Sequence, residues 1–158
     1  MFVDESGFNR GLIGNYGYSR KGVPPTITVD KIKHGNHSAI AALIIGSKPY
    51  VEVIEGACNN ERFQLFCRNL VSHLKQTLDL RRPCVVIMDN ATIHRTGIHE
   101  IFWSEHIYLL KTIPYSPQTN PIEMSFNQAK IALQQIFSSN DNYTRTLTKI
   151  ALQYIQFK

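Results

Sequence analysis

Three acidic residues stand where rigid elements are expected to begin or end. Asp4 follows the apolar residues 1–3. Asp89 follows the apolar run 84–88, and Glu123 lies at the expected start of a helix. Carboxylate oxygens are preferred ligands of Mg²⁺, and a pair of divalent cations can activate an attacking oxygen and stabilise a leaving oxygen in phosphodiester cleavage. The three acids therefore predict a divalent-metal site for phosphodiester chemistry.

The segment before Asp89 predicts the element that positions it. Residues 84–88 form an uninterrupted apolar run rich in β-branched side chains, which is typical of a strand buried on both faces of a sheet. An acid at the end of such a strand lies at the rim of the sheet, where open α/β sheets bind their ligands. We therefore expect Asp89 to face a site at this rim.

Each acid also has a structural explanation that requires no chemistry. Asp4 could begin a turn after a short strand, and Asp89 could cap a turn through its side chain. Glu123 stands three residues after Asn120, which matches a capping box, in which the glutamate bonds the amide of the capping residue. Helical geometry alone favours that cap, with Pro121 at the first helical position. A catalytic assignment therefore needs a signal that joins the three acids.

The composition fits an intracellular globular domain. The chain has 158 residues, of which 43% are hydrophobic and 18% charged, and its net charge of +5 permits a polyanionic partner without requiring one. Its three cysteines lack metal-ligand spacing, so we expect no chemistry from them. We see no membrane-spanning run and no secretory signal, and we expect a location away from membranes, in the nucleus of a eukaryote or the cytoplasm or nucleoid of a bacterium.

Four blocks of sequence resemble the catalytic domain of DDE transposases of the mariner-like superfamily, which includes related bacterial insertion sequences. They are residues 2–7 (FVDESG), 16–22 (YGYSRKG), 88–94 (MDNATIH) and 114–123 (PYSPQTNPIE). The blocks occur in the family's order within residues 2–130, and together they are far more specific than any one of them. This combined match is the signal that joins the three acids.

The resemblance implies a metal-dependent DNA endonuclease and strand transferase that cuts and joins transposon-end DNA. Asp4, Asp89 and Glu123 match the family's catalytic and metal-binding acids, which would hold two Mg²⁺ ions, with Mn²⁺ as the expected substitute. The implied partners are double-stranded DNA, as transposon ends and as target, and no membrane. Transposases of this type generally act as dimers, so a homodimer is a further expectation.

Several polar residues near the acids could support them or contact DNA. Asn90 could orient a metal-bound water or Asp89, and His94 could contact a phosphate, transfer a proton or make a structural hydrogen bond. Glu5 should point to the opposite face of the sheet from Asp4, because successive strand side chains alternate. The other candidates for supporting or DNA-contacting roles are Asn120, Asn127, Lys130, Arg20 and Lys21.

The elements follow an α/β order. Apolar and alternating patterns predict strands at 1–4, 37–45, 50–54, 84–88 and 107–113, and helices at 59–79, 95–105, 120–137 and 147–155. Residues 5–25 are rich in glycine and are expected to form turns and a hairpin. This order is that of the RNase H-like fold, a mixed five-stranded sheet with helices on both faces. The resemblance, and not the periodicity, places the strands that carry Asp4 and Asp89 side by side.

We expect residues 1–158 to form a single catalytic domain, without the helix-turn-helix DNA-binding region that the family usually carries upstream. Two other functions remain open. The chain could be a truncated or domesticated, non-catalytic DNA-binding remnant of a transposase, although three preserved acids argue against this. It could also be a stand-alone nuclease acting on RNA–DNA hybrids, although the block at 114–123 argues against that.

Overall fold

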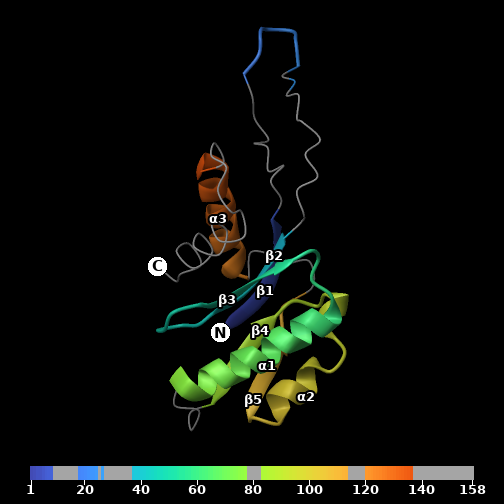
Figure 1. Cartoon of the computed structure of the whole chain (residues 1–158), viewed down its shortest axis with the longest axis vertical. Coiled ribbons are helices and arrows are strands. Elements are labelled where there is room, and N and C mark those ends of the chain that lie inside the picture. Colours follow the sequence, from blue (N-terminus) through green and yellow to red (C-terminus); the bar gives the residue numbers. More distant parts are fainter. Residues whose placement is uncertain (9–17, 25, 27–36, 78–82, 114–119, 137–158) are drawn as a thin grey trace.

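A mixed five-stranded sheet forms the centre of the molecule (Figure 1). The computed structural model describes residues 1–8, 18–24, 26, 37–77, 83–113 and 120–136. Strands β3, β2, β1, β4 and β5 lie side by side in that order. β1 runs antiparallel to β2 and parallel to β4, and β4 runs parallel to β5. The strands are β1 (Phe2–Phe8), β2 (His37–Leu43), β3 (Tyr50–Glu55), β4 (Cys84–Met88) and β5 (Ile107–Lys111).

Helices cover both faces of this sheet, as the sequence predicts. Helices α1 (Asn60–Thr77) and α2 (Ile98–Trp103) lie on one side, and α3 (Ile122–Ile136) lies on the other (Figure 1). Strand β2, between β3 and β1, is buried along its whole length, because alternate side chains meet the two layers. Ile40 packs in the core beneath α1, whereas Ala41 packs in the core beneath α3. The sheet is therefore the middle of three layers.

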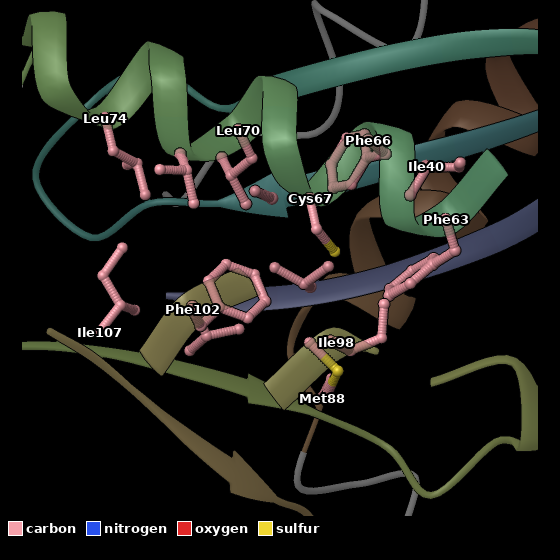
Figure 2. Packing of buried hydrophobic residues seen from close by; sticks show 14 of the residues in the cluster. Ile40, Phe63, Phe66, Cys67, Leu70, Leu74, Met88, Ile98, Phe102 and Ile107 are labelled. Carbon is pink, nitrogen blue, oxygen red and sulfur yellow. The ribbon is translucent and has the colours of Figure 1, made fainter. Parts of the chain in front are cut away.

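The larger core lies between the sheet and helices α1 and α2. Phe63, Phe66, Leu70 and Leu74 recur at helical spacing along α1 and point toward the sheet (Figure 2). Met88 of β4, Ile107 of β5 and the α2 residues Ile98 and Phe102 meet this stripe from below. Full burial of each such side chain contributes about 1.5–3 kcal/mol relative to its exposure. This core fixes β4, and with it the position of Asp89.

The smaller core holds α3 against the other face of the sheet. Ile122, Phe126, Ala129 and Leu133 form the buried stripe of α3. The rings of Phe126 and Phe8 meet edge to face, with their centroids 6.3 Å apart. α3 is thereby anchored to the end of β1 that lies beyond Asp4.

The strand that carries Asp4 is longer than its sequence predicts. The expected strand 1–4, followed directly by turns, is wrong, because β1 continues to Phe8. Its antiparallel neighbour β2 supplies backbone partners through the pair Phe8↔His37, and the buried Phe8 ring adds apolar contact. Asp4 consequently lies within a strand and not at its end.

Two further expectations need correction. β4 is not buried on both faces, because Val86 and Met88 are buried but Val85 and Ile87 are partly exposed. The expected helix 95–105 is shorter: a 3-10 turn, η1 (Thr92–His94), precedes Gly97, which has a positive φ of 74°, and α2 begins only at Ile98. The predicted helix 147–155, together with residues 9–17 and 25 of the expected turns and hairpin in 5–25, lies outside the described residues. Within the described part of the chain, every helix is too short or too polar to span a bilayer.

Candidate active site

The register of two parallel strands brings Asp4 and Asp89 together. Phe2 of β1 pairs with Ile87 of β4. Asp4 lies two residues further along β1, and Asp89 lies two residues beyond Ile87, directly after the end of β4, so this register places the two acids next to each other. The Asp89 charge is close enough to raise the pKa of Asp4. The adjacency expected from the sequence is confirmed for these two acids.

Asp4 is held in a setting that opposes its ionisation. Burial, together with the neighbouring charges of Glu5 and Asp89, raises its pKa to about 7. Two hydrogen bonds fix the carboxylate: the Glu5 backbone N–H donates to Oδ1, and Asn120 Nδ2 donates to Oδ2, each at 2.8 Å. The Asp4 carboxylate is therefore held in a fixed orientation and is suited to bind a cation, since a positive ion would relieve the repulsion between the carboxylates.

Asn120 does not cap α3 through its side chain. Its amide nitrogen reaches Asp4, while its buried Oδ1 has no hydrogen-bond partner among the described residues. The helix begins at Ile122, and the Glu123 backbone N–H bonds the Asn120 carbonyl oxygen at 3.2 Å. The side-chain cap expected at Asn120 is thus wrong, and the capping box considered as an alternative for Glu123 is not formed, because the asparagine side chain binds the acid on β1 instead. Glu123 itself is exposed in the first turn of α3.

Asp89 has one carboxylate oxygen occupied and one free of donors from the described residues. Oδ1 accepts the Ala91 backbone N–H at 2.9 Å and lies 2.6 Å from Nδ1 of His94. The turn cap that the sequence allowed for Asp89 is therefore present. It leaves Oδ2 available, and 47% of the side chain is exposed.

His94 is buried between two carboxylates. Its Nε2 lies 2.8 Å from Glu5 Oε2, and its ring lies 4.2 Å from the ring of Phe63, centroid to centroid. Glu5 thus points to the α1 side of the sheet, as expected from strand alternation. Burial alone would lower the pKa of His94, but the carboxylates of Glu5 and Asp89 outweigh it and raise that pKa. Of the three roles considered for His94, the structural hydrogen bond is the one formed here.

Side chains from two elements, β5 and α1, hold the 89–96 loop that follows β4. From β5, Lys111 Nζ donates to the carbonyl oxygens of Asp89 and His94, at 3.1 and 3.0 Å. From the start of α1, Asn60 Nδ2 donates to the carbonyl oxygens of residues 93 and 96, at 2.7 and 3.1 Å. Gln64 Nε2 also reaches the carbonyl oxygen of residue 96, at 3.2 Å. Sequence reasoning missed these three residues, because nothing in a polar side chain on a surface helix or strand end indicates a loop so distant in the chain.

The remaining sequence candidates lie apart from the paired acids. The Asn90 amide donates to the Thr112 carbonyl oxygen at 2.8 Å and so joins the ends of β4 and β5, while its role in orienting Asp89 or a metal-bound water stays a prediction. Asn127 is exposed on α3, and Lys130 Nζ lies 5.6 Å from the centroid of the Phe8 ring. Arg20 and Lys21 are exposed. Any role of Asn127 or the three basic residues in binding DNA stays a prediction.

Gly97 offers a test of how firmly the 89–96 loop is held. A Cβ at Gly97 would stand 2.9 Å from Gln64 Nε2, the atom that bonds residue 96. Gly46 has a similar φ of 76° but open space around it. We expect Gly46→Ala to lower the free energy of unfolding by about 1 kcal/mol through the left-handed backbone alone. Gly97→Ala should cost about 2–3 kcal/mol, because it also displaces the Gln64 hydrogen bonds.

Urea unfolding of both variants measures this difference. Equal losses for the two glycines would contradict the importance of the Gln64 contact.

The sequence as a whole matches one protein family. The family model described as DDE superfamily endonuclease matches residues 1–144. The chain belongs to this family. The recognition made from the four sequence blocks is confirmed at this level. No curated protein sequence gives a significant match.

Solved structures of DDE enzymes share the fold of this DDE endonuclease domain. The Mos1 mariner paired-end complex with Mn matches with a TM-score of 0.63 at 19% identity, over 97% of this chain and 52% of that one. The catalytic core domain of BIV integrase matches with a TM-score of 0.54 at 18% identity, over 73% of this chain and 72% of that one. A chain of the simian T-cell lymphotropic virus intasome, solved with PP2A regulatory subunit B56 gamma, matches with a TM-score of 0.63 at 15% identity, over 95% of this chain and 45% of that one.

These matches confirm the RNase H-like fold that the sequence predicts. The chain spans about half the length of the intasome and Mos1 chains.

DDE enzymes of this kind use divalent metal ions. Among the described residues, no three His, Cys, Asp or Glu side chains lie close enough together to form a ready three-ligand site. Mg²⁺ nevertheless binds through one or two carboxylates and keeps several waters, so the pair Asp4 and Asp89 fits it. Asn120 supports this pair by donating Nδ2 to Asp4 Oδ2, while its buried Oδ1 has no donor among the described residues. The predicted participation of Glu123 as a third ligand stays a prediction.

Proposed function

We propose that this DDE endonuclease domain is the catalytic part of a mariner-like transposase, which cuts and joins transposon-end DNA by in-line phosphodiester attack. The observation that carries the proposal is the register of β1 and β4, which places Asp4 next to Asp89 at the end of β4, where the Asp89 charge adds to the effects of burial and Glu5 that raise the pKa of Asp4. The four sequence blocks and the likeness to Mos1 complexes support the mariner-like assignment.

Each acid has a distinct part in this proposal. Asp4 and Asp89 would hold two Mg²⁺ ions, for which Mn²⁺ would substitute, and Glu123 would add a third carboxylate from α3. Divalent cations bound there supply activation of the attacking oxygen and stabilisation of the leaving oxygen. Asn120 keeps the Asp4 carboxylate in place through Oδ2, and the Ala91 N–H keeps the Asp89 carboxylate in place through Oδ1. The protein thus supplies oriented carboxylates, so the reacting groups meet in fixed geometry.

The proposed partners are double-stranded DNA and a second copy of the chain. Paired transposon ends require two active sites, which a homodimer provides. The DNA backbone would be met by basic residues, and the candidates are the exposed Arg20 and Lys21 and the partly buried Lys130. Asn127, exposed one turn after Glu123 on α3, is a candidate for a contact with DNA through its uncharged amide.

The proposal is tested by the metal dependence of DNA cleavage. We expect the full chain to nick supercoiled duplex DNA with Mg²⁺ or Mn²⁺ and to lose this activity when EDTA is added. A labelled RNA–DNA hybrid and a labelled DNA duplex of the same sequence should be compared in parallel. Preferred cleavage of the hybrid would support a stand-alone hybrid nuclease instead.

DNA binding that is independent of metal, with no nicking under any of these conditions, would support the non-catalytic remnant. Either of these results would overturn the proposed transposase activity.

A further inference from the structure

Glu5 is the only acid of β1 that faces away from the paired carboxylates, yet it is linked to them through His94. Asp4 and Glu5 are consecutive, so their side chains point to opposite faces of the sheet. Glu5 reaches His94 with Oε2, and His94 reaches Asp89 with its other nitrogen, at 2.8 and 2.6 Å. The chain of contacts runs from β1, through the imidazole, to the end of β4.

The His94 imidazole, in the middle of this series of contacts, is held in one orientation. The His94 side chain is 0% exposed and lies against the Phe63 ring, 4.2 Å between centroids. Its backbone carbonyl oxygen is held by Lys111. The ring is thus contacted on its face and at both nitrogens, and Nδ1 lies 2.6 Å from Asp89 Oδ1 and 3.4 Å from the Asp89 backbone carbonyl oxygen.

The two carboxylate oxygens of Asp89 therefore have different surroundings. Oδ1 receives both the Ala91 N–H and His94 Nδ1, while the described residues offer Oδ2 no donor. An anchored carboxylate of this kind presents one oxygen outward in a defined direction. Partners of this kind, one contact removed from the metal, typically change metal affinity by about 10–100-fold when they are lost.

We propose that Glu5 is a positioning residue, which fixes His94 so that Asp89 presents Oδ2 to a divalent cation. This inference rests on the proposed function, because it assigns Asp89 as a metal ligand. Glu5 is then needed for metal binding without touching the metal, the DNA or the reacting atoms. The hydrogen bond to His94, and not the Glu5 charge, is the essential contribution.

Mn²⁺ binding to the full chain tests the proposal without any cleavage assay. Free Mn²⁺ gives an electron paramagnetic resonance signal that disappears on binding, so titration yields the affinity directly. We expect Glu5→Leu to weaken Mn²⁺ binding at least about tenfold. Glu5→Gln should stay within about threefold of the wild type, since its amide can still bond the imidazole and keep the ring in place.

Two controls separate positioning from general damage to the fold. Leu70→Ala removes a side chain of the core beneath α1 and lowers stability, but the folded variant should bind Mn²⁺ like the wild type. In a His94→Ala background, Glu5→Leu should have no additional effect, because the link to Asp89 is already broken. Additive effects of the two changes would overturn the proposed link.

The outcomes also separate this inference from the proposed function. If Asp89→Asn leaves Mn²⁺ binding unchanged, the proposed metal site itself is wrong. If Asp89→Asn weakens binding while Glu5→Leu does not, only the positioning role of Glu5 is overturned. Equal losses for Glu5→Gln and Glu5→Leu would also overturn it, because charge would then explain the effect better than the hydrogen bond.

Discussion

Asp89→Asn should reduce metal-dependent cleavage of duplex DNA by roughly a thousandfold or more. Metal-ion catalysis supplies several kcal/mol of charge stabilisation in the transition state, and each 1.4 kcal/mol corresponds to about a factor of ten in rate. An amide keeps the shape of the carboxylate and can still accept the Ala91 N–H that bonds Oδ1. The fold should therefore survive, and the lost activity should reflect lost metal binding.

The measurement is the nicking rate with saturating Mn²⁺, together with the unfolding transition of each variant. Glu100→Gln is a suitable control, because Glu100 is an exposed acid on α2 and its change removes the same charge. A variant Asp89→Asn that nicks DNA as fast as Glu100→Gln would show that Asp89 has no catalytic part. Cleavage in the preparation would then have another source.

The layers of the fold were predictable because they depend on apolar periodicity. The α1 stripe from Phe63 to Leu74 and the apolar run 84–88 indicate a helix and a strand without further information. The end of β1 was not predictable from residues 1–8 alone. Two acids and a glycine follow Val3, and only the pairing with β2 keeps these residues in a strand. Strand pairing between distant segments is a tertiary effect that overrides local preference.

The placement of Asp4 next to Asp89 was predictable from the sequence, but their supporting contacts were not. The resemblance placed Asp4 beside Asp89, and the register of β1 and β4 agrees. The partner of Glu5 is 89 positions away, and no local pattern connects it with His94. Asn120 illustrates the opposite error. Its spacing to Glu123 fits a helix cap, but a carboxylate on β1 offers its amide a stronger, charge-assisted partner.

The burial and the neighbouring charges that suit Asp4 for binding a cation should lower the stability of the metal-free protein. We expect Asp4→Asn to raise the free energy of unfolding by about 1–3 kcal/mol at pH 8, a value reduced from the full pKa shift because the side chain is partly exposed. The new amide needs an acceptor where Asp4 Oδ2 now accepts the Asn120 amide. Rotation of the Asn120 amide would supply it, since the buried Oδ1 of Asn120 lacks a partner among the described residues.

The pH dependence of this gain has a definite sign. The pKa of Asp4 is about 7 in the folded protein and 3.8 as its ordinary value. Between these two values the folded chain binds the proton that the unfolded chain has lost, so wild-type stability falls as the pH rises. The advantage of Asp4→Asn should be absent near pH 4, grow toward pH 7 and remain constant above it. Urea unfolding at pH 4, 6 and 8 measures this profile.

Added Mg²⁺ should reverse the order of the two proteins. A ligand that binds only the folded state stabilises it by RT ln(1 + [L]/Kd), so Mg²⁺ should raise the Tm of the wild type but not that of Asp4→Asn. Asp89→Asn is the matched control: it removes the same charge, but its carboxylate is stabilised by Ala91 and His94, so no gain is expected without metal. A gain for both variants, or for neither, would contradict the view that Asp4 is held ready for a cation at the expense of stability.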